Sequence, residues 1–532
     1  MDPVDVLIVG AGPSGAVVAH TLASRGFSVL CLEQGDWVDT TDLPGDKPEF
    51  ELLIRNAWSW DTSKRARRED YPLNLDDAEA PLMMFGAVGG SSVIYGAHWQ
   101  RLLPSDFRVR SLDGICDDWP IEYGDLDPYY QRVDKFIGVS GLGGDPAYPK
   151  QDFPFPPHPI GAGGLQMAAG MNQLGWHWWP GTHAIPTSSY KKMAQCVRWG
   201  VCERGCPAGA KASFDLGYWP HATAAGAKLI TNARVSSITV ERKGLVSGAT
   251  WIDIDGKEHS VNANAVVLAA NGVGTPRLLL MSNDVFPDGL ANSSGLVGKN
   301  LMIHPNAIVT GVYEEDIQSW NGPAGQLIYS LQFYETELSR GFYRGAKWNL
   351  MPIPGVLNVL ELYKDLPFEE RWGEKAHEIS RYAGKILNWY ANIDDLPEES
   401  NRVVLDAQLR DSSGLPAPRV HYRLSENSRM NIEFSLDRMT EAHEAAGAAN
   451  IFSSPILSPS GHLLGTARMG NDPGSSVVDN FGRSHDIPNL FIVDGSVMVT
   501  GGAMNPTATI TALALRAAEH LADDAVNQRS LV

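Results

Sequence analysis

Three cysteines stand close together in a chain that contains only five. Cys196, Cys202 and Cys206 fall within eleven residues, and a proline follows the last of them. Thiolates clustered in this way, ending in Cys-Pro, are typical ligands of an iron–sulfur cluster. Zinc would need a fourth ligand, for which His177 or His183 is available. A third interpretation, reduced cysteines packed in a loop, explains less well why three of the five stand together.

A second set of residues suits a nucleotide. Glycines occur as Gly10-x-Gly12-x-x-Gly15, between an apolar run and a helix-like segment. This spacing permits a tight turn, lets the backbone approach a pyrophosphate and directs a helix N-terminus toward the phosphates. Glu33 closes the next strand-like run, where its carboxylate can accept hydrogen bonds from ribose hydroxyls. Strand, glycines, helix and acid together predict a dinucleotide site, and the acid disfavours a 2′-phosphate.

Further turns carry glycine, hydroxyl, carboxylate and amide groups. They comprise Gly89, Gly90, Ser91 and Ser92, then Asp494, and finally Asn505, Pro506 and Thr507. The glycine–serine turn could present backbone N–H groups and hydroxyls to a phosphate or a flavin edge. Asn505 and Pro506 predict a helix start with Asn505 as its cap. The positive end of this helix suits the pyrimidine edge of a flavin, where reduction places negative charge.

In this order along the chain, the motifs resemble the glucose-methanol-choline (GMC) oxidoreductase family of flavoenzymes. The likeness includes a His-x-x-Gly-Thr segment that begins at His462, and it spans nearly the whole chain. The catalytic subunits of gluconate, glucose, fructose and glucoside dehydrogenases are most similar over residues 101–107, 119–130, 465–470 and 506–516. The resemblance implies FAD and oxidation of an alcohol, and Val235 is counted among the FAD-binding residues.

The resemblance also implies a catalytic pair. His462 matches the family's catalytic histidine and Asn505 its partner, whereas His304 is interpreted as structural. A neutral imidazole can accept the hydroxyl proton while an amide orients the oxygen, and the adjacent C–H then delivers hydride to flavin N5. In some relatives a histidine after the glycine–serine turn attaches FAD covalently. Ile94 stands at the comparable place, so we expect non-covalent FAD, although His98 lies four residues on.

A similar cysteine cluster in electron-transferring members of the family holds a three-iron four-sulfur cluster, which the resemblance implies here. We therefore expect a dehydrogenase that passes electrons to a partner such as a cytochrome c-type subunit. The expected substrate is a sugar or glycoside, with the C3 hydroxyl of a glucoside favoured. The alternative is an oxygen-using flavin oxidase in which the cysteines bind zinc or nothing. A non-catalytic flavoprotein and a nicotinamide-dependent reductase explain the motifs less well.

An α/β fold with two lobes must position these side chains. The predicted Rossmann-like FAD-binding domain is discontinuous, over 1–40, 80–150, 221–305 and 455–532. A β-sheet substrate domain is predicted over 306–454, and 151–220 is a cysteine-containing loop or insertion. Short alternating runs predict a β-meander over 228–271, and further strands over 306–313, 326–334 and 387–393. Helices are predicted within 368–386 and over 428–446 and 507–522.

Charge and hydropathy exclude several classes of function. The 532 residues carry 43 basic and 62 acidic side chains, a net charge of −19, which disfavours binding to nucleic acid or anionic lipid. The short basic run over 64–68 is interpreted as a solvated loop. We expect no membrane span, because that requires about 18 consecutive apolar residues. The N-terminus does not resemble a signal peptide. We therefore expect one of two locations: the periplasm, reached by co-export with a small subunit that carries the signal, or the cytoplasm.

Overall fold

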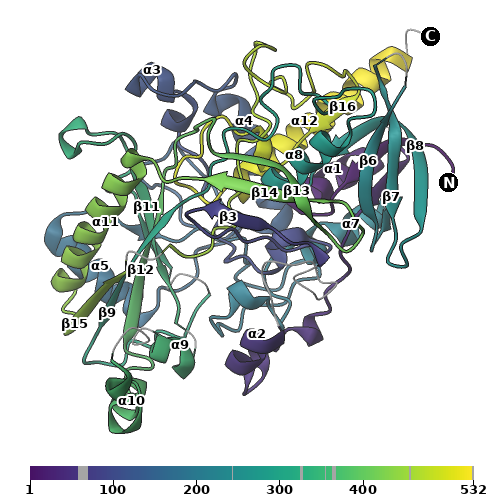
Figure 1. Ribbon diagram of the computed structural model, residues 1–532. Helices are drawn as coiled ribbons and strands as arrows, with labels where there is room; N and C mark the ends of the chain where they lie inside the picture. The colour runs from purple at the N-terminus through teal and green to yellow at the C-terminus, as the bar shows by residue number, and fades with distance from the viewer. Residues whose placement is uncertain are drawn as a thin grey trace.

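The computed structural model describes residues 1–57, 70–241, 244–323, 327–353, 355–361, 367–454 and 457–529. The basic run over 64–68 lies outside the described residues. The described chain contains a seven-stranded, a six-stranded and a three-stranded sheet (Figure 1).

The seven-stranded sheet carries the dinucleotide motif. Its order is β5-β2-β1-β8-β7-β6, and β16 also pairs with β8. The strands are β1 (Val4–Val9), β2 (Val29–Leu32), β5 (Lys228–Ile230), β6 (Arg234–Val240), β7 (Val246–Ile252), β8 (Glu258–Leu268) and β16 (Leu490–Ile492). Strand β8 changes partner along its length: its first half is antiparallel to β7 and its apolar second half is parallel to β1. The predicted meander is therefore confirmed for β6 to β8, whereas β5 pairs in parallel with β2.

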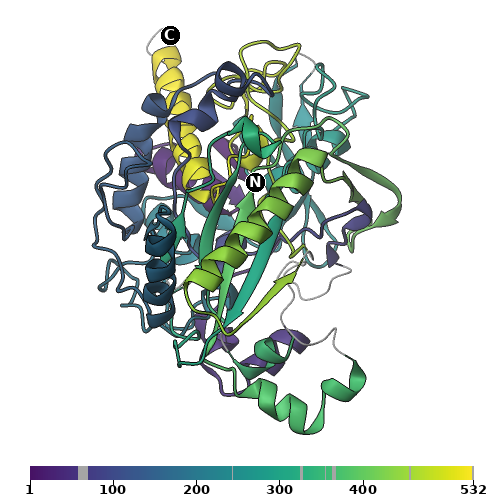
Figure 2. The same ribbon diagram turned by 90° about the vertical axis from the view of Figure 1, so that its left-hand side faces the viewer.

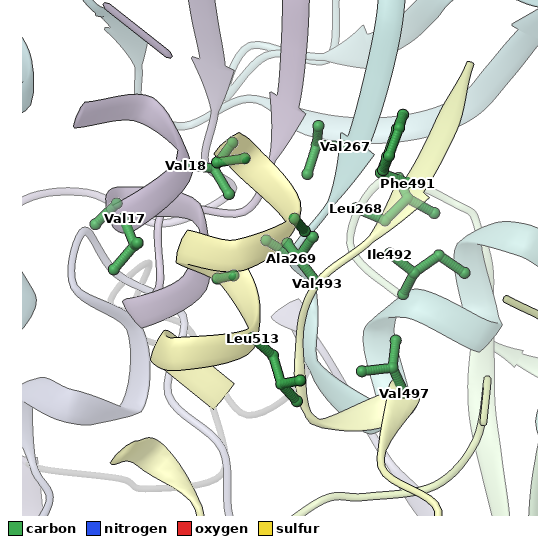
Figure 3. Packing of buried hydrophobic residues seen from close by; sticks show 14 of the residues in the cluster. Val17, Val18, Val267, Leu268, Ala269, Phe491, Ile492, Val493, Val497 and Leu513 are labelled. Atoms are coloured by element: carbon green, nitrogen blue, oxygen red, sulfur yellow. The ribbon is translucent and has the colours of Figure 1, made fainter. Parts of the chain in front are cut away.

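Helices from both ends of the chain pack on this sheet. These are α1 (Pro13–Ser24) and α12 (Thr507–Arg529), which lie against each other. Figure 3 shows Val17 and Val18 of α1, Leu513 of α12 and Val267 of β8 within one buried cluster. Burying each such side chain contributes about 1.5–3 kcal/mol. The predicted discontinuous α/β architecture is thus confirmed, since residues as far apart in the chain as Val17 and Leu513 build one core.

The six-stranded sheet is antiparallel, in the order β15-β9-β12-β11-β10-β4. Its strands are β4 (Trp179–Pro180), β9 (Asn306–Val312), β10 (Ile328–Ser330), β11 (Ala346–Met351), β12 (Ile386–Ile393) and β15 (Asn450–Ser454). One face bears apolar residues such as Trp348 and Trp389, which pack under α5 (Ala162–Leu174) and α11 (Glu426–Ala445). Figure 2 shows α11 lying obliquely across this sheet. The other face is left for polar side chains, because side chains alternate along a strand.

Two predicted elements of this lobe are shorter than expected. Residue 326 of the strand predicted over 326–334 lies outside the described residues, and of the described residues in that range only those of β10 form a strand. The helix predicted within 368–386 is a short 3-10 helix, Phe368–Glu370, followed by α10 (Gly373–Ser380). Gly373 and Gly384 have φ of +65° and +86°, so left-handed backbone interrupts the helical pattern at both positions. The predicted strands over 306–313 and 387–393 and the helix over 428–446 are confirmed as β9, β12 and α11.

The third sheet was not anticipated from the sequence. It joins β3 (Asn74–Ala78) to the hairpin of β13 (Arg402–Arg410) and β14 (Pro416–Tyr422). The other helices are α2 (Phe50–Ala57), α3 (Val109–Asp113), α4 (Tyr123–Ile137), α6 (Phe214–Gly217), α7 (Trp219–Ala224), α8 (Asn271–Met281) and α9 (Val356–Glu361). None of the helices in the described part of the chain is long and apolar enough to cross a membrane.

Candidate active site

A cavity of about 740 Å³ is lined by residues of both larger sheets. Most of the residues predicted to bind the cofactor line it: Gly10, Gly12, Glu33, Gly90, Ser91, Ser92, Val235, Asp494, Pro506 and Thr507. Both members of the predicted catalytic pair, His462 and Asn505, line it as well. The structure therefore brings residues from opposite ends of the chain to one cavity.

Gly15 and Gly89 are outside this lining and have packing roles. A Cβ atom on Gly15 would lie 2.0 Å from the carbonyl oxygen of Gly10, so α1 can approach β1 closely only with glycine there. Gly89 has φ of +91°, and its N–H donates to the carbonyl oxygen of Ala11 at 2.9 Å. The next residue, Gly90, is so close to the first loop that a Cβ atom on it would lie 3.0 Å from the Cα of Gly12. The two glycine-rich loops thus form one bare backbone surface.

Glu33 shapes this surface while it lines the cavity. Its carboxylate oxygens accept from the N–H groups of Ala11 at 2.8 Å and Gly35 at 2.9 Å. Burial raises the pKa of Glu33, and the backbone N–H groups oppose that shift. Each carboxylate oxygen has a second lone pair, so the group can still accept from a ribose hydroxyl.

Ser92 and Asp494 hold neighbouring loops together. The Ser92 hydroxyl donates to the carbonyl oxygen of Gly89 at 2.6 Å and accepts from the N–H of Phe214 at 2.9 Å. Asp494 accepts from the hydroxyl of Thr275 at 2.5 Å and from the N–H of Ser496 at 2.9 Å. Both side chains are buried, so these bonds fix the walls of the cavity.

Helix α12 starts at the predicted residue, but the residue before it differs from the predicted cap. Its first residue is Thr507, and the carbonyl oxygen of Pro506 accepts from the N–H of Ile510 at 2.9 Å. Pro506 therefore occupies the cap position, and the expectation that Asn505 caps the helix is wrong. The Asn505 side chain turns instead toward His462, because its amide is engaged there and with Lys347.

The two predicted catalytic side chains face each other. Asn505 Nδ2 lies 3.4 Å from His462 Nε2, and His462 Nδ1 lies 2.8 Å from Nδ1 of His304. Burial, followed by the nearby His304 and Lys347, lowers the pKa of His462 well below its usual value, so the imidazole is neutral near pH 7. Sequence reasoning set His304 aside as structural, yet it contacts His462 directly.

The polar face of the six-stranded sheet forms a further wall of the cavity. Asn349 of β11 and Asn388, Tyr390 and Asn392 of β12 line it. Lys347, two residues before Asn349 on the same face of β11, contacts Asn505. Sequence reasoning missed these residues, although polar residues alternating with Trp and Leu in a buried strand were the available signal.

The three clustered cysteines do not form a metal site in this structure. In the described part of the chain, which includes all of 196–206, no three His, Cys, Asp or Glu side chains are placed to hold a metal ion. Cys202 is buried, and the Cys206 Sγ accepts from the N–H of Ala210 at 3.4 Å. The structure therefore does not support the predicted iron–sulfur ligation by Cys196, Cys202 and Cys206, and it gives no support to zinc.

Comparison with known proteins agrees with this geometry. Two models described as GMC oxidoreductase match residues 158–306 and 397–514, and a model of an NAD(P)-binding Rossmann-like domain matches residues 8–68. A curated relative, 2-methyl-1,2-propanediol dehydrogenase from Mycolicibacterium austroafricanum, is 40% identical over 99% of this chain and 97% of its own length. The chain belongs to the GMC oxidoreductase family.

Two other comparisons concern a second relative and a solved structure. The fructose dehydrogenase large subunit from Gluconobacter japonicus is 31% identical, with 98% of each chain covered. The crystal structure of pyridoxine 4-oxidase from Mesorbium loti superposes with a TM-score of 0.64 at 18% identity, covering 97% of this chain and 99% of that one, and it shares the fold. As a GMC oxidoreductase, the chain is a flavoenzyme that oxidises CH–OH groups.

The cavity fits FAD. In the paired glycine loops, a Cβ atom on Gly10 would lie 2.5 Å from the carbonyl oxygen of Ala269, and one on Gly90 would lie 3.0 Å from the Cα of Gly12, so the loops line the cavity as close-packed backbone. Glu33 lies at the end of β2, where a ribose can reach it. Residues Asn505, Pro506 and Thr507 bring the N-terminus of α12 to the cavity wall. These are the groups that a dinucleotide and a flavin ring require.

Proposed function

We propose that this GMC oxidoreductase is a dehydrogenase that oxidises a hydroxyl of a sugar, glycoside or related polyol, with a glucoside C3 hydroxyl as the first substrate to test. The observation that carries the proposal is the His462–Asn505 pair inside the cavity, beside the asparagine-rich wall of the six-stranded sheet. Amide groups offer both donors and acceptors, which suits a polyhydroxylated substrate.

His462 is the proposed proton acceptor and Asn505 the group that orients the reacting oxygen. A neutral His462 can take the hydroxyl proton at Nε2, the nitrogen that faces the Asn505 amide. Asn505 Nδ2 can donate to the same oxygen as negative charge develops on it. FAD, held by the paired glycine loops, Glu33, Val235 and the start of α12, supplies the hydride acceptor when it is bound.

We propose that FAD is bound without a covalent link. Ile94 and His98 both line the cavity, and the isoleucine side chain has no atom that can form such a bond. Denaturation of the purified protein in acid should release all of the flavin into the supernatant. Flavin that stays with the precipitate would contradict this part of the proposal and would direct attention to His98.

The relative from Gluconobacter japonicus is named as a large subunit, which supports a small partner subunit for this chain. Our proposal includes such a subunit, a cytochrome c-type electron acceptor and a periplasmic location reached by co-export. We also propose that electrons leave the flavin through an iron–sulfur cluster. The support for this is the clustering of Cys196, Cys202 and Cys206 in the sequence alone. Iron and acid-labile sulfide in anaerobically purified protein would support it, and their absence would remove it.

An oxygen-using oxidase is the second candidate. The observation that favours it is that, within the described residues, the three cysteines are not arranged to hold a metal. One experiment separates the two functions. Flavin absorbance is followed anaerobically during addition of glucosides, glucose, fructose, gluconate and small diols, and the reduced enzyme is then mixed with oxygen or with an artificial acceptor.

The dehydrogenase proposal expects bleaching by at least one polyol, slow reoxidation by oxygen and fast reoxidation by the acceptor. Fast reoxidation by oxygen with release of peroxide would establish the oxidase instead. If none of these alcohols bleaches the flavin of protein that contains FAD, the proposed substrate class is wrong.

A further inference from the structure

A lysine is buried against the proposed catalytic pair. Lys347 of β11 is 0% exposed, and its Nζ contacts Asn505 Oδ1 and lies 3.2 Å from Gln100 Oε1. Both contacts are amide oxygens, so neither supplies the negative charge that would offset the burial of an ammonium group. Burying a charge without such a partner is costly, which makes this residue a candidate for a functional role.

We propose that Lys347 is a positioning residue that acts through Asn505: by donating to Oδ1, it holds the amide with Nδ2 toward His462. This inference rests on the proposed function of the His462–Asn505 pair and names a residue that controls it. An ammonium group has three donors and no acceptor, so it can meet only the oxygen of the amide. Asn392 Nδ2, 3.5 Å from the same oxygen, is a second and more distant donor.

The orientation of Asn505 determines the tautomer of His462. With Nδ2 as the donor toward His462, Nε2 must carry the lone pair, and the proton of the neutral ring lies on Nδ1. That proton is donated to Nδ1 of His304 across 2.8 Å. The hydrogen bonds therefore run in one direction, from Lys347 through Asn505 and His462 to His304.

The opposite orientation of the amide would disable the proposed base. Asn505 Oδ1 would then face His462 Nε2 and would favour the tautomer with a proton on that nitrogen. Such a ring cannot accept the substrate proton at Nε2. Lys347 thus separates a productive from an unproductive arrangement of the same two side chains.

The charge of Lys347 has a second effect on the same base. His98, His304 and His462 face it, and its positive charge contributes to lowering the pKa of each. Burial lowers the pKa of Lys347 itself to about 7, and both of its forms retain N–H donors. Removing the lysine should therefore raise the pKa of His462, in addition to releasing the Asn505 amide.

The first test compares wild type with Lys347→Met and Lys347→Arg. We expect Lys347→Met to lower kcat/KM for flavin reduction about 100-fold, the scale of loss for a misplaced catalytic group. The acid limb of the pH profile of Lys347→Met should move to higher pH, because a cation near His462 is lost. Lys347→Arg keeps donors and charge and should recover part of the rate. A merely structural role would not move the pH limb.

A double-mutant cycle tests whether Lys347 acts through Asn505. The doubly substituted Lys347→Met, Asn505→Ala protein should be as active as Asn505→Ala alone, within about twofold. Lys211 is the matched control, because it is 1% exposed and its Nζ donates to the carbonyl oxygens of Val93, Tyr95 and Cys202. In a protein that carries both Lys211→Met and Asn505→Ala, the losses of activity from the two single substitutions should multiply.

A spectroscopic measurement tests the tautomer independently of turnover. In protein labelled with 15N-histidine, the His462 signal is identified by its loss in His462→Ala. We expect wild type to show an unprotonated Nε2, and Lys347→Met to show a mixture of tautomers.

The inference would be overturned if wild type is active and Lys347→Met has the same kcat/KM. It would also be overturned if the losses of activity from Lys347→Met and Asn505→Ala multiply in the double variant. If Lys347→Met does not fold, an Nε2-protonated His462 in wild type would overturn it. A wild type that no alcohol reduces would instead refute the proposed function, so the two failures are distinguishable.

Discussion

His462 can serve as a base only while its ring is neutral, and its surroundings favour that state. Burial disfavours the imidazolium, and His304 and Lys347 act in the same direction, so the pKa of His462 lies well below 6.5. The group binds its proton only in acid. We predict that kcat/KM for anaerobic flavin reduction stays level as pH falls through 6.5 and declines only well below it. Rates measured from about pH 5 to about pH 8 would check this, and an acid limb at or above 6.5 would contradict it.

Removing the same ring tests its role directly. His462→Ala should lower the rate of flavin reduction by about 10²–10⁴-fold while FAD content is retained, because only the proton acceptor is lost. His443 is a suitable control, since it is a fully buried histidine outside the cavity that contacts Tyr313 and Val309 under α11. His443→Gln should lower thermal stability and leave the rate within a few-fold of wild type. Full turnover in His462→Ala would support a different base.

At the scale of elements, β1 and α1 can meet only because a glycine lies at the crossing. A Cβ atom at Gly15 would lie 2.0 Å from the Gly10 carbonyl oxygen, so the loop or the helix would have to move. We predict that Gly15→Ala lowers FAD affinity at least tenfold or prevents folding, because about 1.4 kcal/mol of distortion is enough for a tenfold loss. Flavin fluorescence titration of the apoprotein measures this.

Gly124 of α4 supplies the control for that substitution. It has ordinary backbone conformation, and a Cβ atom there would meet nothing within 4 Å. Gly124→Ala should leave FAD affinity unchanged and raise helix stability by up to about 1 kcal/mol. Equal effects of the two substitutions on FAD affinity would contradict the steric explanation.

At the scale of the whole molecule, a buried ionic cluster joins the six-stranded sheet to the segment after the glycine–serine turn. Arg344, just before β11, pairs with Asp106 and lies 3.1 Å from Asp394 after β12. All three are almost fully buried. Arg344→Leu would leave two carboxylates without their cation, so we predict a loss of about 3–5 kcal/mol in the free energy of unfolding.

Urea denaturation followed by tryptophan fluorescence would measure this loss. The exposed pair of Lys150 and Asp152, with side chains 87% and 86% exposed and 3.8 Å apart, is the control. Lys150→Leu should change stability by less than about 1 kcal/mol. Similar losses in the two variants would show that burial of the Arg344 cluster is not the reason for its effect.

The nucleotide site could be read from sequence because its geometry is local. A strand, three glycines, a helix and an acid lie within about thirty residues, and their order already places backbone N–H groups and a carboxylate at one end of β1 and β2. The apolar second half of β8 and the long helix after Pro506 were readable for the same reason, since periodicity within one element reports its burial.

The surroundings of His462 were decided by tertiary structure. His304, Lys347 and Asn505 are separated from His462 by between 43 and 158 residues, and they meet only because the two larger sheets pack on opposite sides of one cavity. The sequence around Lys347 does not show that its side chain is buried against Asn505, which lies 158 residues away. The sequence by itself determined the family motifs and the elements that carry them. The contacts of His462 depend on how distant elements pack, and burial in that packing sets the charge state and hydrogen-bond direction of the site.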